Sequence, residues 1–249
     1  MLSTADGLNP PGQEATVAEQ GRVRGRRLVL VRPAERAERS ERTRRTLNVV
    51  VALAALVVAL PVMVVVAVLI KLTSPGPVFY KQTRVGIDRR SAKGGNWRRT
   101  VDYGGRLFTI YKFRTMTASP GTVERQVWAS PDDPRVTRLG RFLRKYRLDE
   151  LPQLINVLRG DMNVVGPRPE QPRIFMSLRT QVERYTARQR VLPGITGWAQ
   201  INQDYDQSLD DVRRKVNLDI EYLHRASVLE DLRILARTLP VVLLKKGAW

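Results

Sequence analysis

Residues 46–70 read TLNVVVALAALVVALPVMVVVAVLI, a stretch without a single charged side chain. As a helix it would measure about 37 Å, against about 30 Å for the hydrocarbon core of a bilayer. Pro61 lies near its middle, where it removes a backbone hydrogen bond and favours a kink. Arginines precede the stretch and Lys71 follows it. Because basic flanks stay cytoplasmic, we predict a re-entrant, proline-kinked membrane helix. An ordinary single-span anchor is the alternative.

The composition predicts an anionic partner and limits the chemistry. The chain has 249 residues and a net charge of +19, which fits nucleic acid, anionic lipid or phosphorylated small molecules. Cysteine is absent, so disulfides, zinc-thiolate sites and cysteine nucleophiles are excluded. His224 is the single histidine, which excludes histidine-rich metal sites. Catalysis would therefore depend on carboxylates, hydroxyls, lysine or arginine.

Three regions follow from the pattern of the chain. We predict a disordered basic arm over residues 1–45, the membrane helix over 46–71 and a cytoplasmic catalytic domain over 72–249. The predicted fold is mainly α with a small β hairpin, in a monotopic membrane protein. The hairpin strands are Val78–Val85 and Leu107–Phe113, joined by a polar surface loop. Apolar periodicity predicts helices over residues 137–158, 172–189, 209–225 and 228–245. The last of these suits a membrane interface nearly as well as a buried position.

The run Arg147–Leu154, RLDELPQL, interrupts the first of these helices. The helical spacing of the apolar residues shifts by one position at this run, and proline is tolerated only in the first turn of a helix. Two helices are therefore expected, with Asp149 near the N-cap of the second and Glu150 beside it. Free backbone N–H groups at such a place favour ionised carboxylates and attract phosphate. Asp149 could then serve as a nucleophile toward phosphorus, or the pair could be an ordinary helix cap.

Several long motifs in the same order carry a resemblance to a known family. They are residues 74–82 (SPGPVFYKQ), 111–116 (YKFRTM), 144–154, 160–169 (GDMNVVGPRP) and 193–200 (PGITGWAQ). From about residue 46 onward the chain resembles the bacterial sugar transferases, the monotopic polyprenyl-phosphate phosphoglycosyl transferases, in their minimal catalytic form.

The resemblance implies a covalent two-step mechanism. An aspartate attacks the β-phosphate of a nucleotide diphospho-sugar, usually a UDP-sugar, and releases UMP. The phospho-sugar then passes to undecaprenyl phosphate, which starts the assembly of a glycan. Asp149 matches the nucleophile, and Glu150 matches its partner in holding Mg²⁺. The other positions that match family residues near the substrates are Lys112, Arg144, Pro167, Arg168, Pro169 and Asp219.

The resemblance also implies the partners and the location. A nucleotide-sugar donor, a polyprenyl phosphate acceptor and membrane lipid are expected, with no nucleic acid and with a homo-oligomer left open. The expected location is the cytoplasmic face of the bacterial inner membrane. The alternative is a membrane-tethered basic protein that binds nucleic acid or acts as a scaffold without enzymatic activity.

Overall fold

A computed structural model describes residues 33–88, 103–117, 133–203 and 206–243, with side chains from residue 41 to residue 241. Residues 1–37 form a unit separate from residues 38–249, and the fold is that of the second unit. It is mostly helical, with two small two-stranded sheets. The predicted arm and the loop after Asp88 lie largely outside the described residues.

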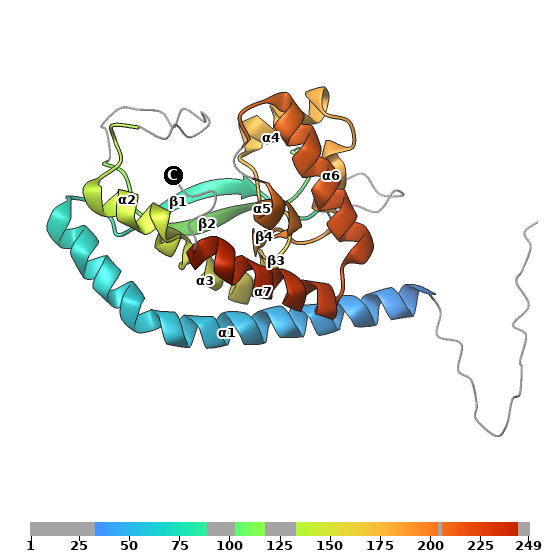
Figure 1. The fold of residues 1–249 in the computed structure, drawn as a ribbon, viewed down its shortest axis with the longest axis horizontal. Helices are drawn as coiled ribbons and strands as arrows, with labels where there is room; N and C mark the ends of the chain where they lie inside the picture. The colour runs from blue at the N-terminus through green and yellow to red at the C-terminus, as the bar shows by residue number, and fades with distance from the viewer. Residues whose placement is uncertain (1–32, 89–102, 118–132, 204–205, 244–249) are drawn as a thin grey trace, which may run out of the picture. The chain divides into compact units, whose positions relative to one another are not determined.

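The first helix, α1, spans Pro33–Thr73 and continues through Pro61. Figure 1 shows it bent along its course without turning back on itself. It begins well before the uncharged stretch, so residues 33–45, which were predicted to belong to the disordered arm, are helical. Its segment Glu41–Thr73 is long and apolar enough to cross a membrane. The re-entrant insertion stays a prediction.

One face of α1 packs on the rest of the domain. The buried side chains on that face recur at helical spacing: Arg44, Asn48, Ala52, Met63, Val66 and Ile70. Most of the valines and leucines between them are exposed, and only 17% of the most apolar stretch is buried within the protein. Exposed apolar surface of this extent is typical of a face that contacts lipid or another protein.

The predicted hairpin is confirmed. Strands β1 (Phe79–Val85) and β2 (Leu107–Phe113) pair antiparallel, with Val85 opposite Leu107 and Phe79 opposite Phe113. Phe108 and Ile110 of β2 pack with buried apolar side chains of α1 and of residues 154–164. The hairpin therefore joins the apolar helix to the centre of the domain.

The break within residues 137–158 is confirmed, but its geometry differs from the prediction. Helix α2 spans Arg138–Lys145 and α3 spans Gln153–Arg159, and the 3₁₀ turn η1, Leu148–Glu150, lies between them. Pro152 is the N-cap of α3. Asp149 is therefore not at the N-cap, because the proline occupies that position and the carboxylates belong to a tight turn three residues earlier.

The C-terminal half contains a second sheet that the sequence pattern did not predict. Strands β3 (Asn163–Val165) and β4 (Gly194–Thr196) pair in parallel. The connection contains α4 (Pro172–Gln181) and the 3₁₀ segment η2 (Tyr185–Arg190), which replace the single predicted helix over 172–189.

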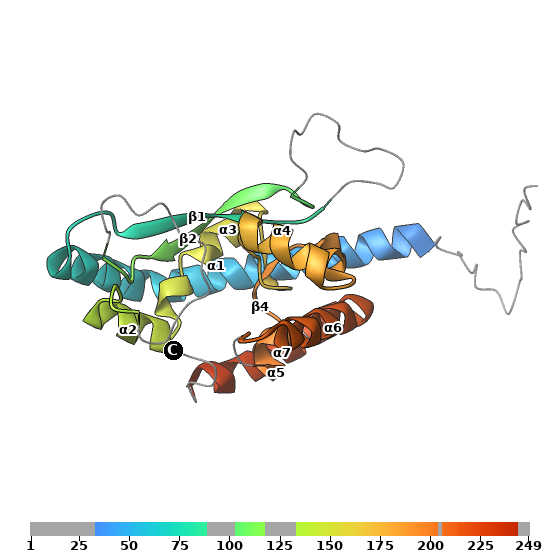
Figure 2. The same cartoon turned by 90° about the horizontal axis from the view of Figure 1, so that it is seen from above.

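Three helices complete the domain. They are α5 (Trp198–Asn202), α6 (Leu209–Arg225) and α7 (Val228–Leu243). In Figure 2 they lie together on one side of the domain, and the β1–β2 hairpin lies on the other. The turn η1 packs against α2 and β2, and the candidate site forms there.

Candidate active site

The tight turn η1 buries two adjacent carboxylates. Arg147 adopts a left-handed backbone, with φ of 54°, and so ends the course of α2. The chain then turns through Leu148–Glu150. Asp149 and Glu150 are each only 7% exposed. Burial of two like charges side by side is unfavourable unless cations compensate them.

Glu150 receives that compensation from two cations. Lys112 Nζ on β2 lies 3.0 Å from Glu150 Oε1. Arg168 forms a forked pair, with Nη2 at 2.5 Å from Oε1 and Nη1 at 3.2 Å from Oε2. Burial alone would raise the pKa of Glu150, but the charges of Arg168 and Lys112 hold this pKa well below its usual range. Glu150 is therefore a fixed anion that orients both cations.

Asp149 differs from its neighbour. Within the described part of the chain, no hydrogen bond or ion pair holds its carboxylate. Burial raises the pKa of Asp149, Lys112 opposes that rise and the charge of Glu150 adds to it. A desolvated carboxylate without a committed partner is suited to react with an electrophile. The two carboxylates thus have separate roles.

Arg144 adds a further cation to the same region. It lies in the last turn of α2, and its Nε donates to Thr115 Oγ1 at 3.0 Å. Its charge also acts to lower the pKa of Asp149. Close packing holds α2 in place, since a Cβ on Gly140 would come within 2.0 Å of the Thr115 carbonyl oxygen. The charge of the predicted Arg144 therefore acts on Asp149, while its direct role at the site stays a prediction.

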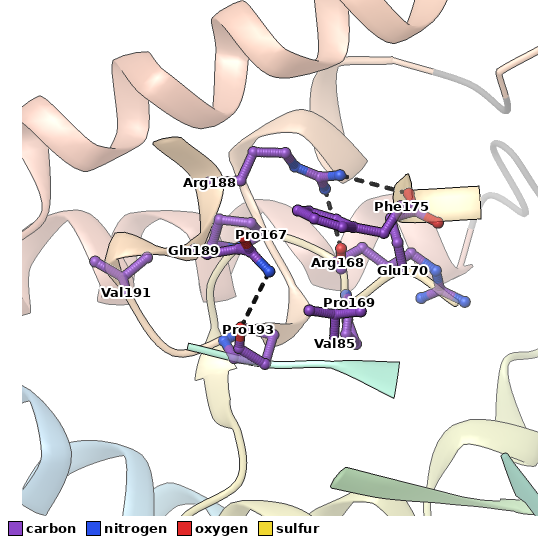
Figure 3. Close-up of a pocket in the computed structure, with 11 residues that line it drawn as sticks. Val85, Pro167, Arg168, Pro169, Glu170, Phe175, Arg188, Gln189, Val191 and Pro193 are labelled. Carbon is purple, nitrogen blue, oxygen red and sulfur yellow. Dashed lines mark hydrogen bonds and ion pairs between the residues drawn. The ribbon is translucent and has the colours of Figure 1, made fainter. Parts of the chain in front are cut away.

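The segment Gly166–Glu170 follows β3 and brings Arg168 to Glu150. A small pocket opens beside this segment, and Pro167, Arg168, Pro169 and Glu170 line it together with Phe175 and Gln189 (Figure 3). The two prolines fix φ near −65° on each side of Arg168. The predicted Pro167, Arg168 and Pro169 thus form one rigid edge of the site.

Asp219 is the predicted site residue that the structure keeps apart from the carboxylate pair. It lies on α6, is 2% exposed, and accepts a 2.7 Å hydrogen bond from Nε of the buried Arg188. Direct contact of Asp219 with substrate stays a prediction. Sequence reasoning missed Arg188 and Thr115, because nothing in their spacing distinguishes them from the many other arginines and threonines.

The carboxylates at this site match the ligand preference of Mg²⁺. Among the described residues, no three Asp, Glu or His side chains gather to hold a metal ion. Asp149 and Glu150 still offer two adjacent carboxylates. Mg²⁺ is commonly held by one or two carboxylates while substrate phosphates and water complete its shell. The residues therefore fit Mg²⁺ that arrives with a phosphorylated ligand.

Comparison with known proteins identifies relatives of this chain. Residues 39–245 match the profile of the family described as bacterial sugar transferase. An undecaprenyl-phosphate glucose phosphotransferase of Komagataeibacter xylinus is 40% identical over 194 residues, 76% of this chain and 34% of its own length. The UDP-N-acetylgalactosamine-undecaprenyl-phosphate N-acetylgalactosaminephosphotransferase of Aeromonas hydrophila is 42% identical over 188 residues, 76% of this chain and 40% of its own length.

A third relative is closer in size. An uncharacterized sugar transferase of Bacillus subtilis is 39% identical over 180 residues, which is 72% of this chain and 76% of the relative. The chain spans only about a third to two fifths of the length of the first two relatives. The similarity therefore covers a shared part of proteins whose names differ in the sugar.

Proposed function

The chain belongs to the bacterial sugar transferase family, and from that premise we propose that it transfers a sugar phosphate from a UDP-sugar to undecaprenyl phosphate. The names of its relatives supply both substrate classes. The observation that carries the proposal is the division of roles in the carboxylate pair: Glu150 is bound by two cations, and Asp149 is held by none of the described hydrogen bonds. The rival interpretation, a nucleic-acid binder or an inactive scaffold, receives no support from the relatives.

In the first step a carboxylate oxygen of Asp149 attacks the β-phosphorus of the donor. A new bond forms between that oxygen and phosphorus, and the bond from phosphorus to the bridging oxygen breaks. The electron pair leaves on UMP, and the sugar phosphate remains on Asp149. Lys112 and Arg168 flank the carboxylates, where their charges offset repulsion between the incoming phosphates and the nucleophile.

In the second step an oxygen of undecaprenyl phosphate attacks the same phosphorus. The bond to Asp149 breaks, the carboxylate is restored, and the product is a lipid-linked diphosphosugar. Arg144, whose charge acts on Asp149, suits the phosphate of this acceptor. Covalent capture lets a water-soluble donor and a lipid acceptor react one after the other.

We also propose that the reaction takes place at the cytoplasmic face of the bacterial inner membrane. The exposed valines and leucines of α1 would lie in lipid, while the domain packed on the buried face of α1 stays at the headgroup level. An acceptor whose chain remains in the bilayer could then present its phosphate to the site.

Mg²⁺ fits the proposed reaction as a partner of Asp149, Glu150 and the donor phosphates. When bound, it would neutralise charge on the pyrophosphate. The side chains retain their own tasks: Asp149 attacks, Glu150 orients Lys112 and Arg168, and Arg168 contacts the donor phosphates.

The test uses the full chain reconstituted in nanodiscs with undecaprenyl phosphate and a panel of UDP-sugars. UMP release is measured for the wild type, for Asp149→Asn and for the control Asp161→Asn, which lies on the loop after α3. We expect release with at least one donor and its loss in Asp149→Asn alone. Mass spectrometry of quenched wild-type reactions should find a sugar-phosphate adduct on the peptide that contains Asp149. Full activity of Asp149→Asn would refute the assignment.

A further inference from the structure

The segment that brings Arg168 to Glu150 has an unusual set of backbone partners. Pro167 and Pro169 have no N–H group, so the segment is held through its carbonyl oxygens. All four consecutive carbonyls accept a hydrogen bond. The donors to residues 167, 168, 169 and 170 are, in that order, Gly194 N at 2.9 Å, Arg188 Nη2 at 3.0 Å, Arg84 Nη1 at 2.9 Å and Val85 N at 2.9 Å.

Two of these donors are side chains, and of the two Arg188 is more buried than Arg84, with 5% of its side chain exposed. Its planar guanidinium reaches four groups at once: Nη2 donates to the Arg168 carbonyl, and Nη1 donates to Tyr185 Oη at 3.1 Å and reaches Glu170 Oε1 at 3.5 Å. Its Nε donates to Asp219. Figure 3 shows Arg188 reaching both Arg168 and Glu170 across the pocket.

The partners of Arg188 are themselves fixed. Glu170 also pairs with Lys215 of α6 at 2.9 Å, and Lys215 forms a second ion pair with Asp206. Asp219 and Lys215 lie on one helix, one turn apart, so α6 presents an anion to Arg188 and a cation to Glu170. The planar guanidinium of an arginine holds several oxygens in one fixed geometry, whereas the ammonium group of a lysine is a point charge on a flexible chain.

We propose that Arg188 is a positioning residue: it fixes the backbone on which Arg168 stands, and through it sets the place of the Arg168 guanidinium at Glu150. Asp219 would then act indirectly, because it holds Arg188 in place through the Arg188 Nε hydrogen bond. This inference gives Asp219 a task that does not require contact with substrate.

A double-mutant cycle tests whether Arg188 acts through Arg168, and this arm rests on the proposed function. Arg188→Lys keeps a cation for Asp219 but loses the fork. We expect kcat/KM for UMP release to fall about 100-fold, the effect of a displacement near 1 Å at a reacting centre. In an Arg168→Ala background the same change should cost less than about twofold, because the group that it misplaces is gone. Arg190→Lys is the matched control, because Arg190 is an exposed arginine of η2, the element that contains Arg188.

Amide hydrogen exchange provides a second arm that needs no turnover. The Val85 amide donates to the Glu170 carbonyl, so its exchange reports how firmly the segment is held. We expect exchange at Val85 to speed up at least tenfold, about 1.4 kcal/mol, in Arg188→Lys. Exchange at Val216, in the middle of α6, should stay at the wild-type rate.

The outcomes separate the two proposals. If the wild type releases no UMP from any donor, the proposed function fails, while exchange at Val85 still decides whether Arg188 holds the segment. Unchanged exchange at Val85, or losses that multiply in the double variant, would overturn the positioning role. Should Arg188→Lys fail to fold, Asp219→Asn, which removes the anchoring charge, enters the same cycle with the same expectations.

Discussion

A buried ion pair joins the apolar helix α1 to α7, and its removal should be costly. Arg44 Nε lies 3.1 Å from Asp231 Oδ2, and the side chains are 9% and 1% exposed. Tyr222 also donates to Asp231 Oδ1 at 2.8 Å. Asp231→Asn keeps the shape of the side chain but leaves the Arg44 charge buried without its counter-ion. Breaking a buried pair from one side typically costs about 3–5 kcal/mol.

That magnitude translates into a melting temperature. For a chain of this size each kcal/mol lowers the melting temperature by about 2–4 °C, so Asp231→Asn should melt about 6–20 °C below the wild type. The assay is thermal unfolding of the full chain in nanodiscs, followed by tryptophan fluorescence. Asp210→Asn is the matched control, because Asp210 pairs with Arg213 on the exposed surface of α6. Its melting temperature should stay within error of the wild type.

A double variant makes the test sharper. Arg44→Met with Asp231→Leu removes both buried charges at once and replaces them with apolar side chains. Such replacements are often neutral, so the double variant should recover most of the stability that Asp231→Asn loses. A drop of less than about 2 °C in Asp231→Asn, under 1 kcal/mol, would refute the reasoning. So would a double variant that is no more stable than the single one.

Two further predictions concern the site. Lys112→Met removes a cation that lowers the pKa of Asp149, so this pKa should rise further above its usual range. The acid limb of the pH profile of kcat/KM should then move to higher pH. An unmoved acid limb would show that Lys112 does not act on Asp149. Removal of divalent cations with EDTA should abolish UMP release, and added Mg²⁺ should restore it. Full UMP release in EDTA would show that the reaction does not need Mg²⁺.

Local signals in the sequence were enough for several elements. Alternation and turn residues predicted both hairpin strands within one residue of their observed bounds. Helix α6 spans the predicted residues, because Ser208 and Asp211 form a capping box and an amphipathic stripe follows them. The break before Pro152 was also readable, since a proline restricts where a helix can continue.

Other elements depend on contacts that sequence spacing does not reveal. Strands β3 and β4 have three residues each, too few to show alternation, and they pair across a long connection. The turn η1 needs a left-handed Arg147, which no local pattern predicts. The chain contains 43 Lys and Arg residues, so Arg188 is recognisable only from its burial and its hydrogen bond to the Arg168 carbonyl.

The two-sided character of α1 affects how the protein can be handled. Its inner face completes the core through Met63, Val66 and Ile70, which pack with Phe113 and Leu143 of the domain. A shortened protein that starts at Ser74 would expose those partners to water and lose the helix that covers them. Work on this domain should therefore keep α1 intact, and the exposed valines and leucines on the outer face of that helix call for detergent or lipid during purification.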